Sequence, residues 1–330
     1  MNWALALLIL FQSAYHVVGR IPLVGEGGWD YLSVDPAARR LYVSRATHVA
    51  VVDLGRDAVI GDIPSTAGVH GIAIAPDLGR GFTSNGRDSS VTIFDLKTLA
   101  TLSTVTVTGR NPDAIAYDPV SHRVFTFNGG TANATALDAR TGTVVGTIAL
   151  GGKPEFAVHD GAGRMYVNIE DKGEVVAFDT RTLAVQAHWS LAPCEEPSGL
   201  AIDRQHRRLF SVCGNRLMAV VDADQGRVLA TLPIGAGVDG AAFDSTSQLA
   251  FSSNGEGTLT VVHEDSPTAF RVVETDSTQR GARTIALDPV THRLYLTTAQ
   301  FGPPPVPTPD RPRPRPSIIP GSVVVLVLQR

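Results

Sequence analysis

Seven polar residues recur along this 330-residue chain at intervals of 40 to 44 residues. Each stands one or two residues before a short apolar run typical of a β-strand. Four carry carboxylates, one an imidazole and one a guanidinium. Hard cations favour carboxylate oxygens, and one neutral imidazole would also admit a transition metal. If these residues meet in space, they could hold a cation or a polar ligand. They are Asp30, His70, Asp113, Glu155, Ser198, Asp239 and Arg283.

The scaffold that positions them repeats with the same period. An apolar strand ends in Asp or a near-equivalent, a tight turn follows, and then a second apolar strand, as in residues 32–35 before 41–44 and 115–118 before 124–127. A repeat of this length, with several short strands and no helical periodicity, is typical of a β-propeller. The fold class is therefore all-β. The repeated end positions are Asp35, Ala75, Asp118, His159, Asp203, Asp244 and Asp288.

Each repeat contains four strands, which in the third unit are predicted at 114–117, 123–127, 135–137 and 144–150. The seventh unit lacks an outer strand, because its third strand, around 322–328, runs into the end of the sequence. Residues 17–23 parallel 144–150, so an amino-terminal strand is expected to close the last blade and hide two sheet edges. The prediction is a seven-bladed β-propeller with four-stranded blades, formed as a single domain by residues 15–330. We expect a monomer.

The amino terminus and the charge balance bear on location and partners. Residues 3–11 are apolar but far short of the roughly 20 that span a bilayer, and they fit the apolar core of a signal peptide. Residues 1–14 are therefore predicted to direct export to the periplasm or outside the cell, without a transmembrane span. Residues 1–14 contain no Lys or Arg, and Gln12 stands where a cleavage site would have a small residue. The alternative that this apolar segment packs on the propeller therefore remains open. A net charge of -4 makes nucleic acid an unlikely partner.

The two cysteines fall in one predicted hairpin. Cys194 lies just before the inner strand of the fifth unit, and Cys213 lies at the end of its second strand. The two ends of such a hairpin meet, so an even pair in an exported protein favours a disulfide. Free buried thiols, or a metal or redox site, remain alternatives.

Several strands resemble a known family. The second strands at 41–44, 164–168 and 293–297, with third strands ending at 51–53 and 220–222, are similar to those of the YVTN-repeat, or YncE-like, β-propellers. The resemblance covers residues 15–330. It implies a seven-bladed propeller that is often exported, and it transfers no catalytic residues because the motif is a structural repeat.

A second group of loops is expected to open on the same face as the seven polar residues. It joins the second and third strands, where Asn recurs partly because Asn tolerates left-handed turns. In the seventh unit this loop is a Pro-rich insertion at 301–320, which favours extended polyproline geometry and could act as a lid or a docking segment. Further ligand candidates from these loops are Asn85, Arg87, Asn128, Asn168 and Asn254.

Three interpretations of this face remain open. It could be a solvated polar channel, a ligand site, or a divalent-metal site with His70, Asp113, Glu155 and Asp239 as candidate ligands. The favoured function is a binding or interaction module of the cell envelope that takes a small polar ligand or an envelope protein. The alternative is a metal-assisted hydrolase or lactonase that uses the channel carboxylates, by analogy with lactonase-type propellers. Whether the protein is an enzyme stays undecided.

Overall fold

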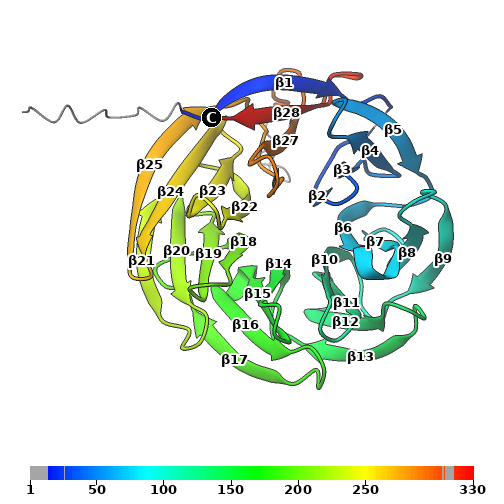
Figure 1. Cartoon of the computed structure of the whole chain (residues 1–330), viewed down its shortest axis with the longest axis horizontal. Coiled ribbons are helices and arrows are strands. Elements are labelled where there is room, and N and C mark those ends of the chain that lie inside the picture. Colours follow the sequence, from blue (N-terminus) through cyan, green and yellow to red (C-terminus); the bar gives the residue numbers. More distant parts are fainter. Residues whose placement is uncertain (1–13, 26, 307, 309–315) are drawn as a thin grey trace, which may run out of the picture.

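The computed structural model describes residues 14–25, 27–306, 308 and 316–330. Its strands form seven four-stranded antiparallel sheets, which stand as blades around a central axis (Figure 1). Within each sheet, strands follow one another outward from the axis in sequence order, except that the outer strand of the seventh blade is β1. The prediction of an all-β, seven-bladed propeller is confirmed.

The blades share one layout. The inner strands are β2 (Leu32–Asp35), β6 (Val69–Ala75), β10 (Pro112–Asp118), β14 (Pro154–His159), β18 (Pro197–Asp203), β22 (Val238–Asp244) and β26 (Ile285–Leu287). The second strands are β3 (Arg40–Ser44), β7 (Arg80–Asn85), β11 (Arg123–Asn128), β15 (Arg164–Ile169), β19 (Arg208–Cys213), β23 (Leu249–Asn254) and β27 (Leu294–Thr298). The third strands are β4 (Val49–Asp53), β8 (Ser90–Asp95), β12 (Asn133–Asp138), β16 (Glu174–Asp179), β20 (Leu217–Asp222), β24 (Thr258–Ser266) and β28 (Val324–Gln329). The outer strands are β5 (Ala58–Ile63), β9 (Thr101–Thr106), β13 (Val144–Ala149), β17 (Val185–Ser190), β21 (Val228–Pro233), β25 (Ala269–Ser277) and β1 (His16–Pro22).

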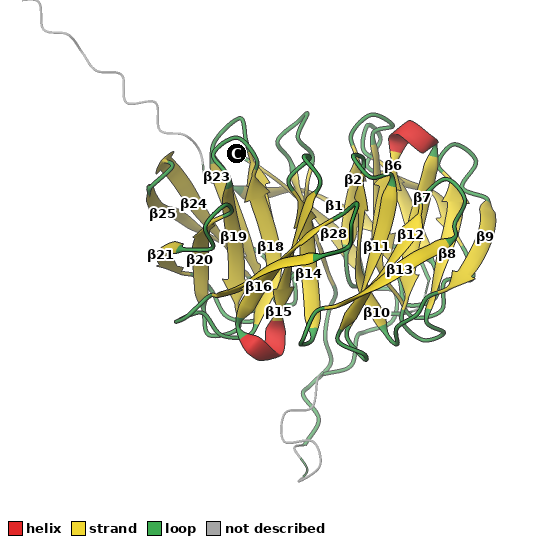
Figure 2. Cartoon of the chain, turned by 90° about the horizontal axis from the view of Figure 1, so that it is seen from below, coloured by secondary structure: helices red, strands yellow, loops and turns green. Residues whose placement is uncertain are grey.

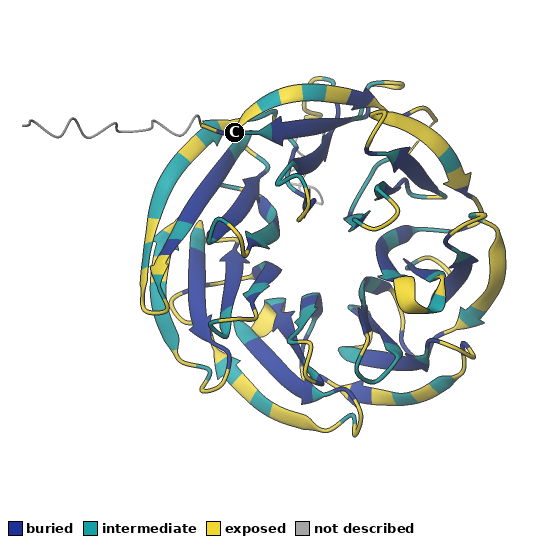
Figure 3. Cartoon of the chain, in the orientation of Figure 1, coloured by how far each residue is buried: buried dark blue, intermediate teal, exposed yellow. Residues whose placement is uncertain are grey.

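The core lies between neighbouring blades. The second and third strands are buried on both faces because each blade packs against the next, whereas the outer strands alternate between exposed and half-buried residues (Figure 3). Phe125 of the third blade, for example, meets Phe178 of the fourth with ring centroids 5.3 Å apart. This explains why second strands read as continuous apolar runs while outer strands alternate.

The end of each third strand is fixed by a carboxylate. Asp53 accepts backbone N–H bonds from Gly55 and Arg56 at 2.8 and 3.0 Å. The same contacts recur at the equivalent Asp of other blades, where N–H donors hold the pKa of Asp95 and Asp138 below its usual range. These acids are therefore part of the turns, as their repeated position predicts.

The ring is closed by its two ends. β1 pairs antiparallel with β28, from His16 opposite Gln329 to Pro22 opposite Val324. Tyr15, only 4% exposed, packs edge-on against Phe251 of the sixth blade. The predicted closure by an amino-terminal strand is confirmed. The predicted signal peptide lies almost entirely outside the described residues.

A disulfide ties the rim end of the fifth blade. Cys194 and Cys213 are bonded, with their Cα atoms 5.8 Å apart. The bond links the segment before β18 to the end of β19 and so closes the hairpin at its open end.

The two faces of the ring differ in which turns they carry. Inner strands begin on one face, which we call the rim face, and end on the opposite face. The described helical segments are η1 (Pro76–Leu78) on the opposite face and η2 (Glu170–Lys172) on the rim face, both too short to cross a membrane (Figure 2). The loop between β27 and β28, which holds the Pro-rich insertion, leaves the ring on the same face as η2 (Figure 2).

Candidate functional site at the channel mouth

Five of the seven recurring polar residues stand inside β-bulges. The register between the inner and second strands shifts within residues 69–72, 112–115, 154–157, 197–200 and 238–240, each of which contains one of them. A bulge turns a strand locally and re-aims its side chains. Asp30 and Arg283 occupy the corresponding places just before β2 and β26. We call the place where this set meets the axis the channel mouth.

Neighbouring blades hold the bulges in place. Ser84 of β7 accepts the N–H of Gly71 at 2.9 Å, and its hydroxyl donates to the carbonyl of Asp113 in the next blade. The bulges also pack too closely for side chains at some positions, because a Cβ on Gly240 would lie 2.9 Å from the backbone nitrogen of Ile285. The backbone that carries the polar residues is therefore rigid.

Three of the mouth residues form a carboxylate–imidazole cluster. His70 Nδ1 lies 2.6 Å from Asp30 Oδ2, with hydrogen-bond geometry, and 3.7 Å from Asp113 Oδ1. Although burial alone would lower the pKa of His70, the hydrogen bond to Asp30 and the charge of Asp113 raise it above its usual value. The imidazole is thereby favoured as a cation that Asp30 orients.

Two further ion pairs complete the mouth. Lys153 Nζ lies 2.7 Å from Glu155 Oε1 and also contacts Glu170 of η2. Arg283 Nε donates to Asp239 Oδ2 at 2.5 Å, and Arg283 Nη2 approaches Asp30 Oδ1 at 3.9 Å. Each cation thus stands between two carboxylates of different segments.

Negative charge is in excess at the centre of this network. Burial, reinforced by the charges of Asp30 and Asp239, raises the pKa of Asp113 to about 6 against the opposing effect of His70. Burial and the charge of Asp113 raise the pKa of Glu155 to about 8, although Lys153 opposes the shift. Near neutral pH the Glu155 carboxyl group therefore holds a proton that an incoming cation could displace, while Asp113 is mostly ionised.

An aromatic pair lies below the carboxylates. Tyr31 and Phe156, from opposite sides of the ring, pack with their centroids 5.3 Å apart. Burial, together with the charges of Asp113, Asp30, Glu155 and Asp239, raises the pKa of the Tyr31 phenol well above its usual value. A cavity of about 220 Å³ lies on the inner strands beyond the pair, toward His159. The pair forms the floor of the mouth.

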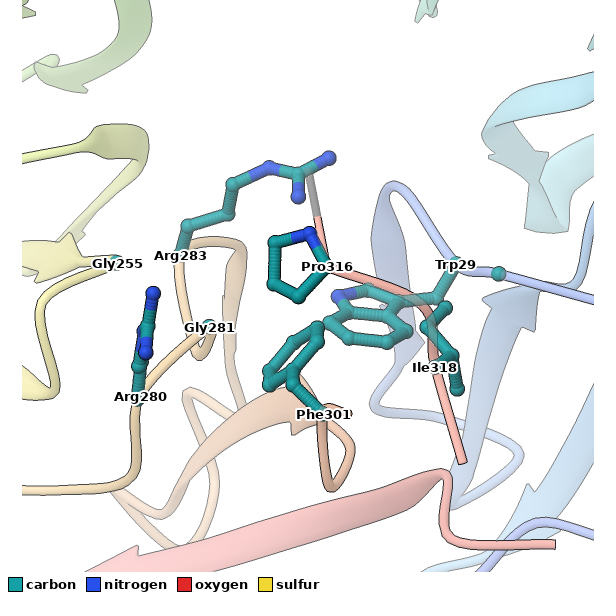
Figure 4. Close-up of a pocket in the computed structure, with 9 residues that line it drawn as sticks. Trp29, Gly255, Arg280, Gly281, Arg283, Phe301, Pro316 and Ile318 are labelled. Atoms are coloured by element: carbon teal, nitrogen blue, oxygen red, sulfur yellow. The ribbon is translucent and has the colours of Figure 1, made fainter. Parts of the chain in front are cut away.

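A second cavity lies beside the mouth, at the base of the Pro-rich insertion. It measures about 310 Å³, and its walls include Trp29, Phe301, Pro316, Arg280 and Arg283 (Figure 4). Trp29 and Phe301 have their ring centroids 6.2 Å apart. The described part of the insertion therefore packs next to Arg283, while the rest of the segment between 301 and 320 lies largely outside the described residues.

The Asn residues predicted from the second group of loops serve the scaffold. The side chains of all four are fully buried. Asn85, Asn128 and Asn254 each hydrogen-bond hydroxyl groups of the third strand in their own blade. Asn168 donates to the carbonyl of Ser198 at 2.9 Å, so it positions a bulge of the next blade.

The remaining two candidates lie apart from the charged network. Arg87 is exposed on its loop, and the Ser198 hydroxyl donates to the carbonyl of Val238 at 3.4 Å. The structure thus brings together the five acids and bases Asp30, His70, Asp113, Glu155 and Asp239 with Arg283, and leaves Ser198, Arg87 and the four Asn outside.

Sequence reasoning did not single out Lys153, Tyr31 or Trp29. Tyr31 and Trp29 adjoin Asp30, and Lys153 stands two residues before Glu155, so adjacency to the recurring positions was an available signal. That Lys153 also reaches Glu170 depends on the three-dimensional path of the loop that contains η2.

Comparison with known proteins supports the architecture. The fold is similar to a chain of hydrazine synthase from Kuenenia stuttgartiensis, with a TM-score of 0.71, 16% identity, and coverage of 83% of this chain and 93% of that one. It is also similar to the structure of U3-55K, with a TM-score of 0.77, 11% identity, and coverage of 94% and 98%. At these identities the likeness shows the fold alone. No protein-family model matches the sequence, and no curated protein matches it either.

Proposed function

We propose that this protein is a non-catalytic binding propeller of the cell envelope, whose channel mouth holds the cationic group of a small polar ligand or of a protein partner. The observation that carries the proposal is the excess of carboxyl groups on rigid bulges, with the pKa of Asp113 raised to about 6 and that of Glu155 to about 8. The Asp113 carboxylate lies 3.7 Å from His70 Nδ1, beyond hydrogen-bond distance. A cationic group beside it would supply the missing partner.

The neighbouring cavity supports a ligand with an apolar part. Trp29 and Phe301 offer aromatic surface beside the mouth, while Arg283 separates this surface from the acidic centre. An ordered apolar pocket with a few convergent charged groups is the usual form of a small-molecule site. The resemblance to YVTN-repeat propellers, which are often exported, implies that such a module would act outside the cytoplasm. The Cys194–Cys213 disulfide is compatible with an oxidising compartment.

Thermal-shift measurements with matched probes would test the proposal. Putrescine supplies two ammonium groups, and 1,4-butanediol is its uncharged counterpart. We expect putrescine, and not butanediol, to raise the melting temperature of the wild type. At a concentration 100-fold above Kd the stabilisation is about 2.7 kcal/mol. Asp113→Asn should lose the shift, whereas Asp57→Asn, an exposed acid on the opposite face, should retain it.

A null result would have a clear meaning. If putrescine, choline and guanidinium all leave the wild type unshifted at pH 8.5, the acidic mouth does not select cationic groups. Equal increases in the melting temperatures of the wild type and Asp113→Asn would show that the probe binds outside the channel mouth. Mass analysis of the exported chain tests the location separately, because cleavage near residue 14 is expected.

A metal-assisted hydrolase is the second candidate, favoured by one observation. Ligand atoms of Asp30, His70 and Asp113 all lie within 4.8 Å of one another. Against it, His70 Nδ1 is already engaged in a hydrogen bond to Asp30. Stoichiometric metal that is lost in His70→Asn, together with chelator-sensitive hydrolysis of lactones, would favour this alternative over simple binding.

A further inference from the structure

Glu264, in the sixth blade, breaks the repeat at a position that the first five blades fill with small or apolar side chains. Its backbone N–H donates to the carbonyl of Gln248 at 2.9 Å, as the residue after each third-strand Asp does in the preceding blades. A carboxylate at this buried position costs free energy unless something compensates its charge. The equivalent residues are Leu54, Leu96, Ala139, Thr180 and Ala223.

The Glu264 carboxylate lacks hydrogen bonds among the described residues. The residue is 3% exposed, and neither of its oxygens has a hydrogen-bond partner. Thr180, the other polar residue at this position, donates its hydroxyl to the Gly163 carbonyl at 3.1 Å and is satisfied. Burial, followed by the charge of Asp203, raises the pKa of Glu264 to about 7.

Two further ligand-type groups face this carboxylate from the fifth blade. His206 Nδ1 lies 3.1 Å from Glu264 Oε1 and 2.7 Å from Asp203 Oδ2, yet it has hydrogen-bond geometry with neither. Asp203 is fixed by the backbone N–H groups of Gln205 and His206, at 2.9 and 3.2 Å. Arg208, the nearby guanidinium, is engaged with Asp222 at 3.2 Å and with the Pro267 carbonyl at 2.7 Å.

A comparable turn shows what is unusual here. His292 Nδ1 makes a regular hydrogen bond to Asp244 Oδ2 at 2.9 Å, between the seventh and sixth blades. Among the described residues, no second carboxylate joins that pair in a group that could hold an ion. At His206 the added Glu264 leaves two carboxylates and one imidazole whose ligand atoms all lie within 4.8 Å of one another.

We propose that Asp203, His206 and Glu264 bind a divalent transition-metal ion, with Zn²⁺ the best fit, and that the ion joins the fifth and sixth blades on the face opposite the channel mouth. Two ligand atoms about 2.1 Å from a tetrahedral Zn²⁺ are about 3.4 Å apart, a spacing that small side-chain rotations reach from ligand atoms that all lie within 4.8 Å of one another. His206 is the accessible member, with 27% of its side chain exposed, so solvent can deliver the ion and a water can complete its coordination.

The test uses untagged full-length protein that has been stripped with chelator and exchanged into chelator-free buffer. Calorimetric titration with ZnCl₂ should show one ion bound per chain, and X-ray absorption should show a single imidazole nitrogen with oxygens at about 2.0–2.1 Å. Glu264→Leu, which copies Leu54 and Leu96, should weaken binding by more than the roughly 100-fold that loss of an outer-shell partner can cost. His70→Asn, in the channel mouth, should bind zinc as the wild type does.

Folding of the variant is checked independently. Without metal, Glu264→Leu should melt at the same temperature as the wild type or higher, so loss of zinc binding cannot be attributed to unfolding; should it fail to fold, Glu264→Gln serves instead. Absence of zinc binding by the wild type, equal binding by wild type and the Glu264 variant, or loss confined to His70→Asn would each overturn the proposal. The last result would place the ion in the mouth.

Discussion

Two clusters of one histidine and two carboxylates stand on opposite faces of the ring, and they differ in how the histidine is satisfied. In the channel mouth, His70 Nδ1 donates to Asp30 Oδ2 at 2.6 Å in a regular hydrogen bond. On the opposite face, His206 lies as close to Asp203 and Glu264 without such geometry. The first cluster contains an ion pair beside the less closely paired Asp113, and the second is the set of ligands that we propose for zinc.

The two clusters depart from the sequence repeat in different ways. In the mouth the side chain at the equivalent position varies among Asp, His, Glu, Ser and Arg from blade to blade, and this variation marks the site. On the opposite face the first five blades place small or apolar side chains at one position, and the sixth places the buried Glu264 there. A single exception at a structural position is therefore as informative as a variable rim.

The largest effect should come from opening the ring that holds both clusters. Deleting residues 15–23 removes β1 and exposes the edge of β28. We expect the product to aggregate or to lose its cooperative transition, as judged by circular dichroism and light scattering. A truncated chain that melts like the full-length protein would refute closure.

Reduction of the disulfide should cost less, and should act on the rim end of the fifth blade rather than on its metal-site end. The bond spans 19 residues, for which loop closure contributes about 3 kcal/mol. Urea unfolding of oxidised protein and of Cys194→Ala/Cys213→Ala measures it. Zinc binding should survive the double substitution; identical midpoints would show that the bond adds nothing.

Removing the buried charge on the opposite face should stabilise the metal-free protein. The folded-state pKa of Glu264, about 7, exceeds the unfolded value of about 4.3, so the folded state binds the proton more tightly and its stability falls as pH rises between these values. With chelator at pH 8.5, Glu264→Leu should be more stable than the wild type by about 2–3 kcal/mol. A difference that does not grow between pH 4 and 8 would contradict this reading.

Removing the raised-pKa acid Glu155 from the channel mouth should have a smaller effect on the free energy of unfolding. The pKa of Glu155 is raised to about 8, so its ionisation also destabilises the folded state as pH rises toward that value. Because Glu155→Gln also deprives Lys153 of its carboxylate partner, the variant should gain only about 1–2 kcal/mol at pH 9, with little change at pH 4. Parallel stability curves for the two proteins would argue that the acid is not perturbed.

The smallest effect on stability is expected from shortening the insertion. Gly302 N–H donates to the Ser317 carbonyl at 2.8 Å and Ile319 N–H to Gln300 at 2.9 Å, so the base is held without residues 303–315. Replacing 303–315 with Asn-Gly should change stability by about 0.5 kcal/mol or less while altering binding at the mouth. A large loss of stability with unchanged binding would make the insertion a structural clasp.

The architecture could be predicted from the sequence because the same pattern of strands and turns recurs in all seven blades. The positions of Asp30, His70, Asp113, Glu155, Asp239 and Arg283 followed from one repeated place before the inner strand. The roles of Asn85, Asn128 and Asn254 could not be predicted in this way. A buried amide that hydrogen-bonds strand hydroxyls and an exposed amide that binds a ligand would occupy the same position in the sequence repeat.

Contacts between blades were the part that sequence reasoning could not supply. Whether Lys153 pairs with Glu170, or His206 meets Glu264, depends on how two loops of different blades approach each other. Glu264 did carry a signal, since Leu54 and Leu96 stand at its position in other units.

Anomalous scattering at the zinc absorption edge, from crystals of the stripped protein resoaked in zinc, tests the contrast between the two clusters most directly. The account predicts a strong peak among Asp203, His206 and Glu264, and none at His70 in the mouth. A peak among Asp30, His70 and Asp113, with nothing at Glu264, would reverse the two assignments and favour a metal-dependent activity at the mouth.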